Sequence, residues 1–174
     1  MAVFSESGLD TQMDDLARRA GLGVGTLYRH FPTKDDLVRA VIVHHMAAMA
    51  EEAKIRLEAE GEDPWEAFSG FLLNCANRHE RQRLLSQVLA TQPSSWFRHA
   101  AVVETELAER ASRLMARAQA DGTVRTDARG DDIPVIMCGL SAVLQTDWGT
   151  SAGRRYMRLV LDGLRVHDSD PLPD

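Results

Sequence analysis

Residues 17–32 read ARRAGLGVGTLYRHFP, and this stretch decides the expected fold of the 174-residue chain. Thr11 can cap a first short helix, and Gly21 follows that helix as a left-handed C-terminal glycine would. A second short helix is predicted over about Gly23 to His30, because Pro32 cannot continue a helix. Two short helices joined by a tight glycine-containing turn fit a helix-turn-helix, whose second helix enters the major groove of DNA.

The second short helix carries many hydrogen-bond donors for its length. The side chains that can donate are those of Thr26, Tyr28, Arg29 and His30. Leu27 and Phe31 lie four residues apart, and we expect them to hold the helix on its neighbours. Gly23 and Gly25 lower helix propensity by about 1 kcal/mol each relative to alanine. Close approach to DNA would explain them, and so would close packing against the preceding helix; both explanations stay open.

Residues 17–34, followed by Leu37, resemble the helix-turn-helix signature of the tetracycline-repressor (TetR) family of bacterial regulators. An alanine, a glycine, Thr-Leu-Tyr, His-Phe and a lysine that opens the next helix stand at that family's spacing. The resemblance implies a transcriptional regulator, expected to be a repressor, that binds a palindromic double-stranded operator as a homodimer. The DNA-contacting residues that it implies are Thr11, Val24, Gly25, Thr26, Tyr28, Arg29, His30 and Lys34.

These residues divide by the chemistry of their side chains. Tyr28 and His30 look like the family's phosphate contacts, and Lys34 at a helix N-terminus could hold one phosphate. Arg29 is expected to read sequence, because a guanidinium pairs bidentately with guanine O6 and N7. The residues expected to face base edges or thymine methyl groups are Val24 and Gly25.

Beyond this region the Gly, Pro and capping residues stand where helices begin and end. Apolar and polar residues do not alternate there as they do in strands. Expected helices cover about 34–59, a segment from Pro64 that includes Cys75, 81–91, the stretch from after Phe97 to Ala120, 132–144 and 153–166, with a polar loop over 123–131. The predicted fold is all-α. We expect a helix-turn-helix DNA-binding domain over residues 1–37, a helical ligand-binding and dimerisation domain over 38–168, and a disordered tail over 169–174.

The larger domain is expected to bind an unidentified small-molecule effector that releases the repressor from DNA, in an apolar pocket. Candidate lining residues, each of which could also be ordinary core, are Phe68, Phe71, Asn74, Trp96, Phe97, Met115, Met137 and Ser141. The last two helices, about 131–145 and 153–166, are apolar on more than one side. We therefore expect a symmetry mate to bury them in the homodimer.

Charge argues against the DNA-binding interpretation. The net charge is −6, and residues 1–37 hold four basic residues, namely Arg18, Arg19, Arg29 and Lys34, against six acidic ones. Residues 2–7 are also too short for an independent helix, so the first helix of the family is expected to be truncated. An alternative therefore stays open, in which the chain is a helical ligand-binding or interaction module whose helix-turn-helix no longer binds DNA.

Other classes of protein are disfavoured by the residues that are missing. No nucleophile–base pair marks an enzyme, and no His-x-x-x-His or Cys-x-x-Cys spacing marks a metal site, so we predict neither catalysis, metal nor cofactor. Cys75 and Cys138 are expected to be reduced thiols in a cytoplasmic protein. No apolar run is long enough for a bilayer, and no membrane partner is expected. The charged run 104–110 is expected to be a solvated helix face.

Overall fold

The structure, a computed structural model, describes residues 12–81, 106–144, 146, 149–167 and 170–173. Within these residues it contains helices and one isolated bridge between Val124 and Arg165, which confirms the predicted all-α fold. The helices are α2 (Met13–Arg19), α3 (Val24–His30), α4 (Lys34–Glu58), α5 (Pro64–Arg81), α9 (Leu107–Ala120), α10 (Asp132–Leu144) and α11 (Gly149–Leu164). None of them is long and apolar enough to cross a membrane.

Several predictions fall outside the part of the chain that the structure describes. They are the first helix, the Thr11 cap, the helix over 81–91 beyond its first residue, and the positions of Trp96 and Phe97. In α2, the N-cap position belongs to Gln12, whose side chain makes no capping hydrogen bond. Asp14 is accordingly the second helical residue, where its carboxylate still lies in the first turn and favours the helix dipole.

Local sequence explains where the long helices begin. Thr33 caps α4 by accepting a hydrogen bond from the Asp36 backbone N–H at 3.1 Å, and the Asp36 carboxylate accepts one from the Thr33 N–H at 3.1 Å. This reciprocal pair is a capping box. Asp63 caps α5 in the same way by accepting from the N–H of Glu66 at 2.9 Å, with Pro64 at the first helical position.

The last helix begins at Gly149, four residues before the predicted start at Gly153. Gly153 lies inside the helix because it faces α10: a Cβ atom there would lie 2.7 Å from Cδ2 of Leu144. Gly139 of α10 is the counterpart, since its Cβ would lie 2.3 Å from Oη of Tyr156. The two glycines therefore allow α10 and α11 to pack closely, and Gly153 lies within a helix instead of marking its beginning.

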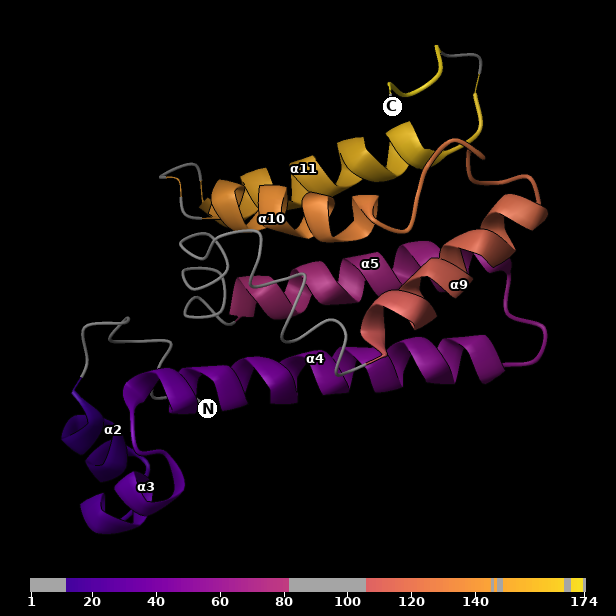
Figure 1. Cartoon of the computed structure of the whole chain (residues 1–174). Helices are drawn as coiled ribbons and strands as arrows, with labels where there is room; N and C mark the ends of the chain where they lie inside the picture. Colours follow the sequence, from indigo (N-terminus) through magenta and orange to yellow (C-terminus); the bar gives the residue numbers. More distant parts are fainter. Residues whose placement is uncertain (1–11, 82–105, 145, 147–148, 168–169, 174) are drawn as a thin grey trace.

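Two hydrophobic cores share one long helix. A large core lies among α4, α5, α9, α10 and α11, and a small one lies among α2, α3 and the start of α4. Leu37 belongs to the small core, and Met46, Met49 and Ala53 of the same helix belong to the large one. In Figure 1, α2 and α3 lie at one end of α4, away from α10 and α11. The chain thus divides into a small head and a larger body joined through α4.

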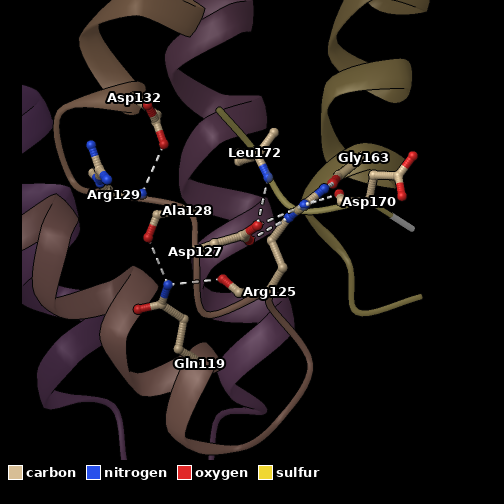
Figure 2. A network of polar contacts seen from close by, with 9 residues as sticks. All are labelled: Gln119, Arg125, Asp127, Ala128, Arg129, Asp132, Gly163, Asp170 and Leu172. Carbon is tan, nitrogen blue, oxygen red and sulfur yellow. Dashed lines mark hydrogen bonds and ion pairs between the residues drawn. The ribbon is translucent and has the colours of Figure 1, made fainter. Parts of the chain in front are cut away.

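The loop between α9 and α10 holds the end of the chain (Figure 2). Arg125 pairs with the Asp127 carboxylate at 2.6 Å and donates a hydrogen bond to the Asp170 carbonyl at 2.9 Å. The Leu172 N–H donates to Asp127 at 2.8 Å. Composition predicts a disordered tail over 169–174, but the structure places Asp170 and Leu172 on this loop because two of their backbone groups find charged partners there.

Candidate nucleic-acid interface

The turn between α2 and α3 follows from one glycine. Gly21 has φ of +68°, in the left-handed region that glycine adopts without strain. Its N–H donates to the Arg18 carbonyl at 3.1 Å, and the Leu22 N–H donates to the Ala17 carbonyl at 2.9 Å. These two bonds form the Schellman motif that ends a helix. Gly21 therefore closes α2 as predicted, and the chain is turned directly into α3.

The inner side of α3 is fixed by the small core. Leu27 is buried together with Met13, Leu16, Ala17 and Leu37. Phe31 packs against this cluster from the C-cap of α3, so the structural roles expected for Leu27 and Phe31 are confirmed.

Val24 also packs, partly buried, against the small core. The sequence assigns this residue to base edges, and only the exposed part of its side chain is available for that role.

The outer side of α3 presents polar groups to solvent. Tyr28 is 45% exposed, and the other exposed members of this face are Gly25, Thr26, Arg29 and His30. Among the described residues, the side chains of Thr26, Tyr28 and Arg29 make no hydrogen bond or ion pair. Arg29 and His30 lie in the last turn of α3, where the helix dipole favours positive charge. The structure thus brings the predicted DNA-contacting residues of α3, apart from the partly buried Val24, onto one solvent-facing surface.

The glycines of α3 do not serve packing within the described part of the chain. A Cβ atom at Gly25 would have no described neighbour within 4 Å. At Gly23 the nearest atom would be Oγ1 of Thr26 at 3.5 Å, an ordinary contact. Among the described residues, close packing of α3 on α2 therefore needs neither glycine.

Two acidic residues of the head have structural partners. Asp36 belongs to the capping box of α4, and Asp15 forms an exposed ion pair with Arg18. Lys34, the first residue of α4, is partly exposed beside the free end of that helix. Of the six acidic residues of the head, Asp15 and Asp36 thus have partners outside α3.

Five of the eight residues predicted to line an effector pocket are buried in the body. Phe68 and Phe71 of α5 share the large core with Met115 of α9 and Met137 of α10. Ser141 is fully buried, and its hydroxyl donates to the Met137 carbonyl at 2.9 Å.

The Asn74 amide takes another direction, because it donates to the Glu52 carboxylate of α4 at 2.5 Å. A polar residue predicted for the pocket thus connects α5 with the helix that carries the head.

The sequence missed a role for the arginines of α9. Arg110 forms the expected ion pair with Glu106, yet it also donates to the Ala50 carbonyl of α4 at 3.0 Å. Arg117, one heptad later, donates to the Leu57 carbonyl at 3.1 Å. The available signal is their spacing, because both arginines flank the buried stripe of α9 that contains Leu114.

Comparisons with known proteins agree with this architecture. Residues 1–41 match the family described as bacterial regulatory proteins of the tetR family, and residues 63–166 match the C-terminal domain of SbtR-like transcriptional regulators. A TetR regulatory protein from Mycobacterium vanbaalenii is 32% identical in sequence, with a TM-score of 0.61 over 94% of this chain and 89% of that one.

A TetR regulator from Streptomyces coelicolor is 28% identical, with a TM-score of 0.66 over 94% of this chain and 92% of that one. The HTH-type transcriptional repressor KstR of Rhodococcus jostii is 28% identical over 122 residues. That alignment spans 70% of this chain and 56% of the repressor's length.

Proposed function

Because the chain belongs to the TetR family of bacterial transcriptional regulators, we propose that it is a repressor that binds a palindromic operator as a homodimer. The observation that carries the proposal is the surface of α3. Thr26, Tyr28 and Arg29 face solvent without hydrogen-bond or ion-pair partners among the described residues, while Leu27 anchors the inner side in the small core. A short helix held from behind with its donors turned outward has the form of a recognition helix.

Residue roles on this surface follow from reach and chemistry. Tyr28 and His30 contact phosphate, and Lys34 adds a cation at the N-terminus of α4, where the helix dipole favours an anion. Arg29 reads guanine in the major groove, and Gly25 allows the backbone to come close to a base edge. Thr11 and Thr26 are further phosphate contacts, the first of them outside the described residues.

Dimerisation is proposed through α10 and α11. Val135 of α10 is 70% exposed and Leu159 of α11 is 67% exposed. Each is a large aliphatic side chain on a helix whose other face enters the large core, and a two-fold axis would bring each against its symmetry mate. In Figure 1 this helix pair covers one side of the body, with α4 on the opposite side. Two heads would then bind half-sites about one DNA turn apart, roughly 34–36 Å.

The effector is proposed to bind among α5, α9 and α10, where aromatic and sulfur-containing side chains gather. Phe68, Phe71, Met115 and Met137 supply apolar area, and Ser141 supplies a hydroxyl. Such a composition suits a largely apolar ligand with few polar groups. Asn74 is proposed to connect the ligand site with α4, because its amide donates a hydrogen bond to Glu52 of that helix.

The experiment is an electrophoretic mobility shift of the full chain on DNA upstream of its own gene, over a series of salt concentrations. A sequence-specific complex that weakens with salt is expected, because phosphate contacts release counterions. Arg29→Ala should relax specificity at one or two base pairs, by about 1–3 kcal/mol. Tyr28→Phe and Lys34→Ala should weaken cognate and scrambled DNA alike.

Two results would contradict these assignments. Equal losses on cognate and scrambled DNA for Arg29→Ala would remove its role in reading bases. Absence of any specific, salt-sensitive complex would favour the alternative, a ligand-binding module whose helix-turn-helix no longer binds DNA.

A further inference from the structure

The position of the head is determined by α4. Of the described helices, only α4 contributes buried residues to both cores, Leu37 to the small one and Met46 to Ala53 to the large one. Among the described residues, the head and the body otherwise have separate cores. Within this part of the chain, the orientation of α3 relative to the body therefore depends on how the second half of α4 is held.

Helix α9 holds that half of α4 by two arginine contacts. Arg110 donates to the Ala50 carbonyl at 3.0 Å, and Arg117 donates to the Leu57 carbonyl at 3.1 Å and the Arg56 carbonyl at 3.3 Å. Both Arg110–Ala50 and Arg117–Leu57 join residues separated by 60 positions. A constant separation means that the two helices run parallel and in register, with one arginine contact at each end of the shared stretch.

Small buried side chains lie along the stretch that the two arginine contacts span. They are Ala50 and Ala53 of α4 and Ala111 of α9, each with at most 2% exposure. Alanine pairs let helix backbones approach closely, and a close-packed contact cannot slide without opening voids. Apolar packing alone would allow α4 to rotate against α9. Two directional hydrogen bonds about 10 Å apart along the helix axis prevent that rotation.

Arg117 also donates hydrogen bonds to the C-terminal end of α4. The last carbonyls of a helix lack intrahelical partners, and the negative end of the helix dipole lies there. The guanidinium of Arg117 donates to two of these carbonyls, those of Arg56 and Leu57. Arg110 is held in turn by acidic side chains on both helices, Glu106 of α9 and Glu51 of α4. The guanidinium of Arg110 is thus held by side chains of both helices as well as by its hydrogen bond to Ala50.

We propose that Arg110 and Arg117 are positioning residues that set the tilt of α4, and through it the spacing of operator half-sites that the homodimer accepts. This inference rests on the proposed function. Thirteen residues separate Ala50 from Leu37, or about 20 Å of helix at about 1.5 Å per residue. A tilt of about 5° at Ala50 moves the head by about 1.7 Å, so two protomers together change their separation by about one base-pair step of 3.4 Å.

The test is a selection of binding sites from a randomised DNA library with the full-length chain, followed by affinity measurements on selected half-sites placed at different spacings. Wild type, Arg110→Met, Arg117→Met and the double variant are compared, because methionine keeps an apolar stem and removes the donors. Arg113→Met is the matched control, since Arg113 lies on the exposed side of the same helix. Circular dichroism monitors folding.

The expected result distinguishes a change in the half-site sequence that is selected from a change in the preferred spacing between half-sites. Wild type and Arg113→Met should prefer one spacing at least tenfold over sites one base pair longer or shorter. The methionine variants should select the same half-site but reduce that preference to threefold or less. Arg110→Lys and Arg117→Lys, which keep a charged donor, should retain part of it.

Spacing profiles like that of wild type in folded methionine variants would overturn the proposal. If one methionine variant does not fold, the other decides, and an unchanged profile there also overturns the proposal. A wild-type protein that selects no site at all refutes the proposed function instead, so the two failures are distinguishable.

Discussion

Replacing Gly25 with alanine should move stability and DNA affinity in opposite directions. A Cβ atom at this position meets no described atom within 4 Å, so the fold accepts the methyl group without rearrangement. Alanine favours the helical state over glycine by about 0.5–1 kcal/mol at an exposed helix position. The free energy of unfolding of the head should therefore rise by that amount.

The same methyl group lies on the surface proposed to face DNA. Its neighbours Thr26 and Tyr28 are exposed on that face, so a base edge apposed to Gly25 must move away from the added carbon. Forcing an extra methyl into a close-packed contact typically costs about 1–3 kcal/mol. With tenfold per 1.4 kcal/mol, the dissociation constant should rise about 5- to 140-fold.

Both quantities are measurable on one preparation, by urea denaturation followed with circular dichroism and by fluorescence anisotropy on a labelled operator. Ala47→Gly is the matched control, because Ala47 is exposed in the helical interior of α4 and reverses the same exchange. It should lower the free energy of unfolding by about 0.5–1 kcal/mol, which checks the helix-propensity part of the prediction. An affinity of Gly25→Ala equal to or tighter than that of wild type would refute the placement of Gly25 against DNA.

Three further outcomes are expected. Leu27→Ala should destabilise the small core by about 2–5 kcal/mol, so operator binding is lost at a lower temperature than the unfolding of the body, as followed by calorimetry and mobility shift. The hydrogen bonds from Arg125 hold the pKa of the Asp127 carboxyl well below its usual range. Because this pKa is depressed in the folded state, its stabilising effect is complete above the ordinary carboxyl pKa of about 3.9 and is lost as pH falls toward the folded value. The protection factor of the Leu172 amide, which is its exchange corrected for the intrinsic rate at each pH, should therefore fall on acidification, and Asp127→Asn should lower it at every pH above that range. Burial raises the pKa of the Cys75 thiol, which stays neutral, so iodoacetamide should modify half-exposed Cys138 first, as mass spectrometry can show; equal rates at both thiols would contradict the burial of Cys75.

Helix boundaries were predictable wherever a local chemical signal sets them. Thr33 with Asp36, Asp63 with Pro64, and Gly21 each fix a helix end through contacts within a few residues, and the structure contains all three. The start of α11 was wrong by four residues, because Gly153 serves a contact with Leu144 of α10. Sequence shows that a glycine is present but not which distant side chain it makes room for.

The α3 residues were predictable as a set but not in their orientation. Resemblance and donor chemistry selected Tyr28 and Arg29, and the structure places both on the outer face. Val24 was assigned to DNA, yet it packs partly against the small core. The same residue types at neighbouring positions face inward or outward according to the angle at which α3 meets α2, which depends on the turn at Gly21 and on the core behind it.

The sequence by itself determined that the chain is all-α and carries a helix-turn-helix, because capping residues, Pro and Gly act within a few positions. Resemblance over residues 17–34 added the family and the recognition residues from Val24 onward. Only the tertiary structure decided that Gly25 has open space beside it among the described residues. It also decided that Arg110 and Arg117 donate hydrogen bonds to backbone carbonyls of α4. These features join residues about 60 positions apart or concern a surface that no neighbour covers, and they follow from how the helices pack, which local pattern does not specify.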